Sequence, residues 1–405
     1  MLERIFPGWN DRTVKYFYLS EAAMNMWVIA PVWYFIFRHF VTTSEIGINE
    51  MIAFAVGFLA EVPSGALADS IGRRKTLILG GILLVIGSIA TVGAFNLVTL
   101  ILAQSIWFIG YAFYSGANEA LVYDKLIADK KEHMWSKISA RKNSLIVFAT
   151  MFSVLIGGFL YATDYRLPYI VHTFAMILFL FCVVRYPKDE TLAVINTSAH
   201  SFAEYWKNLL IGGKELLRPQ LRFLLWGVLV FATLYYAYEW GVLRPLILSS
   251  HGYEGFTASI LSFIVYIGLF IMFLILPKVF GKNVGERKVL IGVILASIVY
   301  SMLFVNTNIL YTGIVVIIFT MISETIKWWT SIYVNKHVSS AHRATALSSW
   351  AMLQKVPYIL LVGMMTNLAA QAFSMFILVS GVIAGLFAFG TLILLPKIDP
   401  TLKTK

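Results

Sequence analysis

Apolar runs of about twenty residues follow one another along almost the whole chain, and this pattern limits the possible folds more than any other feature. A helix that crosses a membrane needs about 20 mostly apolar residues. The composition agrees, because 59% of the 405 residues are hydrophobic and only 13% are charged. A soluble core does not need that much apolar surface. The chain is therefore expected to fold as an all-α membrane protein.

Twelve transmembrane helices are expected from these runs. The longest stretch between two runs divides them into two sets of six, and it carries aromatic and leucine residues on one helical face. We expect a six-helix bundle over 1–185, a cytoplasmic linker with an amphipathic interfacial helix over 186–220, and a second six-helix bundle over 221–405. The predicted spans are 14–38, 44–68, 76–95, 98–124, 141–162, 167–185, 221–249, 257–280, 288–305, 309–336, 344–366 and 371–395.

Basic residues collect on one side of the predicted spans. Alternate loops, counted from the amino terminus and including both chain ends, contain 27 of the 32 Lys and Arg residues. Cytoplasmic flanks carry such an excess, so we expect a multi-pass protein of the inner (cytoplasmic) cell membrane with both termini in the cytoplasm. This anchoring also explains the net charge of +11. No nucleic-acid partner is expected, because the cations carry no RNA-binding signature.

A short charged hinge between the second and third spans has a weaker copy in the other half of the chain. The first copy, "GRRKTLILGG", starts at Gly72, and the second, "GERKVLIG", starts at Gly285. Pro63 and Pro277 precede these glycines by nine and eight residues. Internal repeats of this kind are typical of secondary transporters. The two bundles are therefore expected to be pseudo-symmetric.

The hinge "GALADSIGRRKTL" closely resembles the signature loop of the major facilitator superfamily. The matching positions are Gly65, Leu67, Ala68, Asp69, Gly72, Arg73 and Lys75. With the twelve spans and their division into two sets of six, the resemblance covers essentially the whole chain. It implies the major facilitator fold, transport by alternating access, and a central cavity lined by spans 1, 4, 7 and 10.

The resemblance also implies that the hinge is a conformational latch, broken and remade during transport. The expected members of this latch are Gly65, Asp69, Gly72, Arg73, Lys75 and Asp124. Gly65 is expected to let two helices approach closely, and Gly72 to permit a sharp turn. Asp124 is a natural partner for Arg73. The alternative is that the cations only fix the topology, which leaves the glycines and Asp69 unexplained.

Ionisable residues deep within the predicted spans are candidates for function, because each costs several kcal/mol at the bilayer centre, about 2.5–3.5 on insertion scales. Four acids fall on spans 1, 4, 7 and 10, and we expect them to couple transport to a proton gradient: Glu21, Glu119, Glu239 and Glu324. Glu119 and Glu21 are the favoured proton carriers. Glu324 is three residues from Lys327 on one helical face, so the two side chains are expected to pair.

The substrate cavity is expected to contain polar and aromatic side chains from the same spans. Its candidate residues are Asn25, Asn118, Tyr111, Tyr235, Tyr236, Lys327, Trp328, Gln354 and Lys355. Aromatic rings can hold an amphipathic or cationic organic solute by stacking or cation–π contact. Glu324, Lys327 and Lys355 are assigned to a charge network that rearranges with substrate. The alternative for these three residues is a static set of ion pairs between helices.

The first functional hypothesis is a proton-coupled exporter of small organic compounds, an antiporter of the multidrug efflux type. It rests on the segments "YSGANEALVYDKL" and "EVPSGALAD", which are similar to a branch of efflux-type permeases. The elements typical of drug antiporters are incomplete, because Ile106 stands at the position of their span 4 arginine and Ser153 and Val154 replace a Gly-Pro pair. The alternative is a proton-coupled symporter or a facilitator that imports a nutrient.

A third hypothesis, a membrane receptor or an intramembrane enzyme, has little support. The sequence contains no phosphate-binding loop and no zinc-protease or serine-hydrolase motif. Its single cysteine, Cys182, lies inside a predicted span, which excludes a disulfide framework and a cysteine-based metal site. We expect no enzyme activity, no cofactor beyond the proton gradient and no metal. The expected partners are a small organic solute, protons and the lipid bilayer, and the protein is expected to be a monomer.

Overall fold

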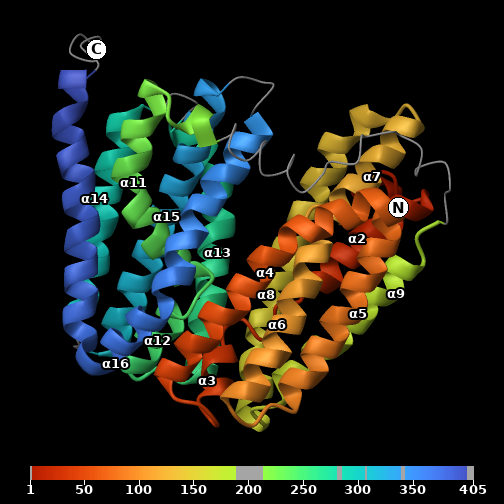
Figure 1. The fold of residues 1–405 in the computed structure, drawn as a ribbon, viewed down its shortest axis with the longest axis horizontal. Helices are drawn as coiled ribbons and strands as arrows, with labels where there is room; N and C mark the ends of the chain where they lie inside the picture. The colour runs from red at the N-terminus through yellow and green to blue at the C-terminus, as the bar shows by residue number, and fades with distance from the viewer. Residues whose placement is uncertain (1, 188–212, 281–284, 306–307, 339–342, 399–405) are drawn as a thin grey trace. The chain divides into compact units, whose positions relative to one another are not determined.

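The computed structural model describes residues 2–187, 213–280, 285–305, 308–338 and 343–398. All regular structure in these residues is helical (Figure 1). The helices in chain order are α1 (Leu2–Ile5), α2 (Arg12–Met24), α3 (Trp33–Phe37), α4 (Thr43–Ile71), α5 (Arg73–Val92), α6 (Leu97–Tyr114), α7 (Ala117–Ala128), the short η1 (Glu132–Met134), α8 (Trp135–Thr163), α9 (Leu167–Val184), α11 (Pro219–Glu239), α12 (Leu243–Ser250), α13 (Gly255–Phe280), α14 (Glu286–Ser301), the short η3 (Met302–Phe304), α15 (Ile309–His337) and α16 (Arg343–Ile398).

The described helices account for all twelve predicted spans, although only nine are by themselves long and apolar enough to cross a membrane. Spans 1 and 7 are each broken into two shorter helices, α2 with α3 and α11 with α12. Spans 11 and 12 run together in α16, whose 56 residues are far too long for one crossing at about 1.5 Å per residue. Non-helical backbone at Ala372 (φ −145°, ψ 57°) divides α16 into the two spans.

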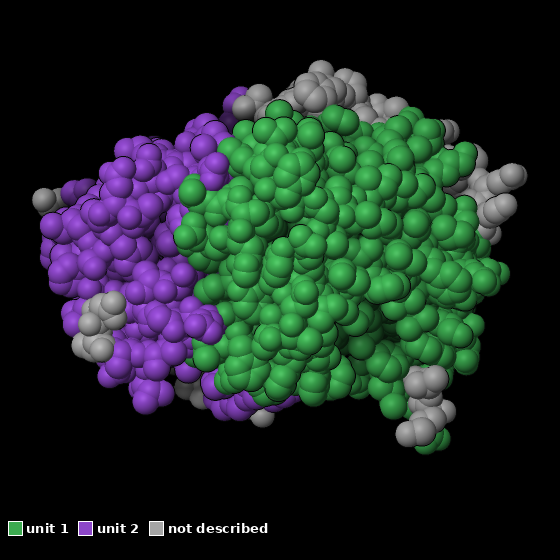
Figure 2. Space-filling model, turned by 90° about the horizontal axis from the view of Figure 1, so that it is seen from below, with its two compact units in different colours: residues 1–42, 52–205, 255–263 green, residues 43–51, 206–254, 264–405 purple. Residues whose placement is uncertain are grey.

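The chain forms two compact units, coloured separately in Figure 2. Unit 1 carries most of the first six spans and unit 2 most of the last six. Two short segments are exchanged: the start of α4 is grouped with unit 2, and the start of α13 with unit 1. The predicted interfacial helix lies mostly outside the described residues. Unit 1 consists of residues 1–42, 52–205 and 255–263, and unit 2 of residues 43–51, 206–254 and 264–405.

Glycines let α5 and α6 pack backbone against backbone in unit 1. A Cβ atom at Gly110 would lie 2.8 Å from the carbonyl oxygen of Gly80, and one at Gly87 would lie 2.6 Å from the backbone nitrogen of Trp107. Small residues at such contacts are typical of membrane helices, since lipid tails supply no hydrophobic force that drives helices together. This packing fixes the position of α6, which carries part of the candidate site.

Glycines also let two helices pack closely in unit 2. A Cβ atom at Gly381 would lie 3.0 Å from the ring of Tyr300, and one at Gly385 would lie 3.4 Å from the Cβ atom of Ser297. Both partners lie on α14, so the last part of α16 packs directly on this helix. Figure 1 shows α14 and α16 together in the group of helices that ends at the carboxyl terminus.

The first span, predicted over 14–38, is not one continuous helix. Helix α2 ends at Met24, and the backbone from Asn25 to Val32 is non-helical before α3 begins. Pro31 contributes to the break, because proline has no N–H group and disfavours helical conformation in the residue before it. The hydroxyl of Thr150 on α8 donates to the freed carbonyl oxygen of Asn25 at 3.2 Å, as backbone at membrane depth requires.

Two further spans on the predicted cavity are also interrupted. Span 4 breaks at Ser115 and Gly116, where Gly116 adopts a φ of +77° that residues with a side chain rarely adopt. Span 7 breaks between Glu239 and Leu243. Discontinuous membrane helices are often found at the binding sites of secondary transporters. Each of the three breaks lies within four residues of a predicted site acid, and these acids define the candidate site.

Candidate functional site

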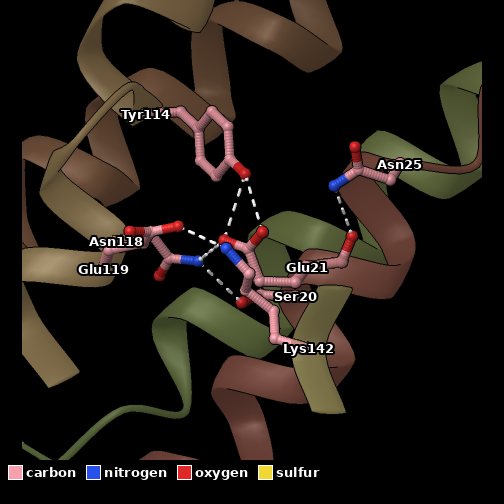
Figure 3. Close-up of polar contacts among 7 residues, drawn as sticks. All are labelled: Ser20, Glu21, Asn25, Tyr114, Asn118, Glu119 and Lys142. Carbon is pink, nitrogen blue, oxygen red and sulfur yellow. Dashed lines mark hydrogen bonds and ion pairs between the residues drawn. The ribbon is translucent and has the colours of Figure 1, made fainter. Parts of the chain in front are cut away.

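A buried polar network in unit 1 surrounds Glu21, which lies in the last turn of α2 (Figure 3). The residue is only 2% exposed. The phenol of Tyr114, at the end of α6, donates to its two carboxyl oxygens, each at 3.0 Å. The side-chain amide of Asn118, in the first turn of α7, donates to Oε1 at 2.7 Å. The donors to this carboxyl group are neutral side chains from both sides of the span 4 break.

Asn118 connects Glu21 to Ser20 and to Tyr186, which follows α9. Its amide nitrogen also donates to the hydroxyl of Ser20 at 3.1 Å, and its amide oxygen accepts from the phenol of Tyr186 at 2.7 Å. The hydroxyls of Ser20 and Tyr186 are 3.2 Å apart. Because Ser20, Asn118 and Tyr186 are all at most 2% exposed, this is a dry hydrogen-bond network, and its strength depends on every member being satisfied.

The sequence places Glu21 in this network by ending α2 three residues later, at Met24. The side-chain amide of Asn25 donates to the backbone oxygen of Glu21 at 2.8 Å (Figure 3), which satisfies a carbonyl group at the end of the helix. Asn25 was predicted as a cavity residue. In the structure it caps α2 and accepts a bond of 3.4 Å from the indole of Trp27.

Glu119 is paired in a different way from Glu21. Its carboxyl group forms an ion pair with the ammonium of Lys142 on α8 (Figure 3). The Glu119 side chain is 49% exposed, whereas the Lys142 side chain is 8% exposed. The main role that this geometry gives Glu119 is to neutralise a buried cation, so Glu21 and Glu119 do not have equivalent surroundings.

A separate ion-pair cluster lies in unit 2. The ammonium of Lys327 on α15 lies 3.0 Å from a carboxyl oxygen of Glu239 and 3.2 Å from one of Glu324. The predicted pairing of Glu324 with Lys327 is therefore confirmed. The phenol of Tyr235 donates to Glu324 at 2.8 Å. The Lys327 side chain is 52% exposed, so its ammonium group is not enclosed within this unit.

The two clusters have the same plan. In each unit an acid in the last turn of the first span's helix, Glu21 on α2 or Glu239 on α11, bonds to residues of the fourth span. This agrees with the internal repeat of the sequence. The four predicted acids thus form two groups, with neutral donors around Glu21 and a shared ammonium between Glu239 and Glu324.

The aromatic residues predicted for the cavity lie beside these clusters. The ring of Tyr111 stacks on Trp107 at 5.5 Å and lies 5.8 Å from Tyr114. In unit 2 the ring of Tyr236 lies 5.5 Å from Tyr358. Trp328, Gln354 and Lys355 are partly exposed on α15 and α16, and Gln354 donates to the backbone oxygen of Trp350. The roles of these residues in binding remain predictions.

The hinge agrees with the predicted latch in two respects. Arg73 forms an ion pair of 2.6 Å with Asp124, which confirms the predicted partners. Gly72 has a φ of +90°, which confirms that the turn requires glycine. A Cβ atom at Gly65 would meet none of the described atoms of unit 1 within 4 Å, so the expected close helix approach at Gly65 is not seen within this unit and stays a prediction. Lys75 is exposed, and the Asp69 side chain lies outside the described part of the structure.

Several members of the site were not predicted from the sequence. Tyr114 lies four residues before Asn118, and this spacing places two residues on one face of a continuous helix. The spacing could therefore have indicated that Tyr114 belongs to the same site as Asn118. Ser20, Tyr186 and Lys142 were not. Tyr186 and Lys142 were assigned to loops or span ends, and their contacts join residues far apart in the sequence.

No group of three or more His, Cys, Asp or Glu side chains in the described residues could hold a metal ion. The arrangement instead offers carboxyl groups in two contrasting surroundings, next to aromatic side chains, inside a set of membrane-spanning helices. Such groups can take up and release protons, and the rings and the Lys327 ammonium can contact an organic solute.

Comparison with known proteins agrees with this description. A sequence model of the Major Facilitator Superfamily matches residues 21–362. No curated protein sequence gave a match. Among solved structures, a nucleoside transporter, NupG, superposes with a TM-score of 0.74 at 12% identity, covering 95% of this chain and 98% of its own.

Two other solved structures show the same fold. A POT family transporter in complex with 5-aminolevulinic acid superposes with a TM-score of 0.67 at 14% identity, covering 98% of this chain and 100% of its own. A D-xylose–proton symporter superposes with a TM-score of 0.64 at 14% identity, covering 93% of this chain and 95% of its own. At such low identity these likenesses establish the fold alone.

Proposed function

This chain belongs to the major facilitator superfamily and is a membrane transporter rather than an enzyme, and from that premise we propose that it moves a small organic solute by coupling it to protons. The observation that carries the proposal is Glu21, a buried carboxyl group whose hydrogen-bond donors are neutral. The nearby cation Lys142 acts on Glu21 electrostatically, but its ion pair is with Glu119 and not with Glu21. A buried charge without a directly paired counter-ion is costly. Glu21 therefore binds a proton when it is enclosed and releases it when its surroundings open.

The unit 2 cluster supports the same coupling. Glu239 and Glu324 share the single ammonium of Lys327, so a proton or a cationic solute can neutralise the remaining charge. An anionic group of the solute can instead compete for Lys327, whose side chain is half exposed. Either event changes which carboxyl group the ammonium holds, and this links solute binding to protonation.

For the direction of transport, we infer proton antiport that exports the solute, supported by the resemblance of "YSGANEALVYDKL" to efflux-type permeases. Import by proton symport is the second candidate. It is favoured by the fold shared with a structure described as a D-xylose–proton symporter. We place the chain in the cytoplasmic membrane as a monomer, with the basic side of the spans in the cytoplasm.

The test begins with purified protein. A thermal-shift screen of organic cations, anions, sugars and amino acids identifies a solute that stabilises the folded state, since a ligand raises stability by binding it. Proteoliposomes loaded with a pH-sensitive dye are then given a gradient of that solute. Proton movement against the direction of the solute identifies antiport, movement with it identifies symport, and no proton movement contradicts proton coupling.

The matched variants are Glu21→Gln and Glu132→Gln. The amide of Glu21→Gln keeps the shape of the side chain but cannot carry a proton, so solute-driven proton movement is expected to fall to the level of empty liposomes. Glu132 is an exposed acid that precedes the predicted span 141–162, and its replacement is expected to leave the rate unchanged. Normal proton movement in Glu21→Gln would remove this residue from the mechanism.

A further inference from the structure

Glu50, on α4, is a buried carboxyl group outside both clusters of the candidate site. It is 5% exposed, and it accepts a hydrogen bond of 3.1 Å from the phenol of Tyr358 on α16. Both residues belong to unit 2. The proposed function gives Glu50 no task, and a buried carboxyl group at membrane depth needs an explanation because it is costly there.

Glu50 lies in the segment Thr43–Met51, which is grouped with unit 2 although the chain on both sides of it is grouped with unit 1. The segment packs closely on α16. A side chain at Gly47 would collide with Thr366, and a Cβ atom at Gly363 would lie 3.9 Å from the sulfur of Met51. The segment is thus docked on α16 through small residues and through the hydrogen bond between Glu50 and Tyr358.

The docked state carries a cost at the residue next to Glu50. Asn49 is fully buried, and neither atom of its amide group has a hydrogen-bond partner in the described residues. A buried polar group without a hydrogen-bond partner destabilises the state in which it is buried. This cost opposes the docking of the segment, so docking is less favourable than its tight packing alone would indicate.

Among the described residues, the groups that act on Glu50 are neutral. Its hydrogen-bond partner is the phenol of Tyr358, whose ring lies 5.5 Å from that of Tyr236 on α11. The next acid on the same segment, Glu45, is partly exposed. No ion pair links Glu50 to a lysine or arginine among the described residues. A charged carboxylate here would be buried beside neutral phenols, which is unfavourable.

We propose that Glu50 carries a proton while the segment Thr43–Met51 is docked on α16, and that loss of this proton releases the segment. The neutral carboxyl group keeps its bond to Tyr358 by accepting on its carbonyl oxygen. The charged form has no compensating cation in the docked site and is stabilised by reaching water. This inference goes beyond the proposed function, and it holds whether or not Glu21 carries the transported proton.

The test is pH-dependent thiol labelling in the full chain with Cys182→Ser, which removes the single native cysteine. The reporter is Ile46→Cys, because Ile46 is fully buried in the segment. The reference is Ile48→Cys, since Ile48 is 37% exposed. The ratio of the two maleimide rates cancels the pH dependence of the thiol itself. It is measured across the pH range in which maleimide is selective for thiols.

The labelling ratio is expected to rise with pH by up to about tenfold per pH unit, the limit for loss of one proton. In Glu50→Gln the ratio is expected to stay low and flat. Glu45→Gln, a matched change in the same segment, should keep the rise. Gly47→Ala should give a high ratio at every pH, because its side chain cannot fit against Thr366.

A flat ratio in the protein that retains Glu50, or the same rise in Glu50→Gln, would overturn the proposal. Tyr358→Phe provides a second route if Glu50→Gln does not reach the membrane. It removes the phenol and keeps the ring, so the rise should persist with a displaced midpoint. Loss of the rise in Tyr358→Phe would assign the titration to the phenol, and the proposal would then be wrong. No step of this test requires a transported solute.

Discussion

At the scale of single residues, the structure separates acids that the sequence presents as equivalent. Glu21 and Glu119 were both expected to carry protons. Glu21 is enclosed by neutral donors, whereas Glu119 is half exposed and paired with Lys142. The position of an acid in the chain fixes its depth in the membrane, but its partners come from other helices. Lys142 was assigned to a cytoplasmic flank, so its ion pair was not foreseen.

Replacing Glu119 is expected to affect stability more than coupling. Glu119→Gln leaves the ammonium of Lys142, whose side chain is 8% exposed, without its anion. We expect the free energy of unfolding to fall by about 1–2 kcal/mol, a modest amount because the carboxyl side of the pair is half solvated. The added change Lys142→Met should restore the apparent melting temperature. Purified variants in detergent provide the measurement.

The opposite result would return Glu119 to the role predicted from the sequence. This is the case if Glu119→Gln melts like the unchanged protein and yet no longer moves protons in loaded proteoliposomes. Glu132→Gln, at an exposed acid, is the control for both measurements.

At the scale of helices, glycine contacts decide how closely elements pack. Gly87 on α5 lies against the backbone of Trp107 on α6, whereas a Cβ atom at Gly93, just after α5, would meet only its own helix, at 3.7 Å. Both residues are glycines near apolar runs, so the sequence alone does not distinguish them. The difference arises from the neighbouring helix.

Gly87→Ala is therefore expected to destabilise unit 1 by about 1–3 kcal/mol, because α5 and α6 must separate to admit the methyl group. Gly93→Ala should change stability much less. Apparent melting temperatures of the two variants in one detergent check this prediction. Equal melting temperatures would show that the contact at Gly87 relaxes without cost.

At the scale of the whole molecule, the distribution of basic residues predicts the orientation of the protein in the membrane. Both termini are expected in the cytoplasm. A fluorescent protein fused after Lys405 should fluoresce, and alkaline phosphatase fused there should be inactive. The reverse pattern is expected for fusions in the turn after Thr163, which follows span 5. Active phosphatase at the carboxyl terminus would invert the proposed orientation.

The latch gives a second prediction at this scale. Asp124→Asn removes the ion pair with Arg73 and is expected to change the distance distribution between spin labels on the two units, placed by Ala162→Cys and Ser250→Cys in a Cys182→Ser background. Pulsed electron spin resonance measures this distribution. Asp129→Asn, which removes the neighbouring pair with Lys125, should leave it unchanged. Identical distributions for both variants would make the Arg73 pair a local contact only.

The sequence by itself determined the membrane environment, the twelve spans, the internal repeat and the family, because apolar length, charge asymmetry and the hinge motif are local properties that need no neighbour. It also predicted the pairs Glu324–Lys327 and Arg73–Asp124. Only the tertiary structure decided where spans 1, 4 and 7 break, which donors surround Glu21, and that Glu50 is buried against Tyr358. These features depend on contacts between helices far apart in the chain, and the sequence of one helix does not specify which residues of another helix it will contact.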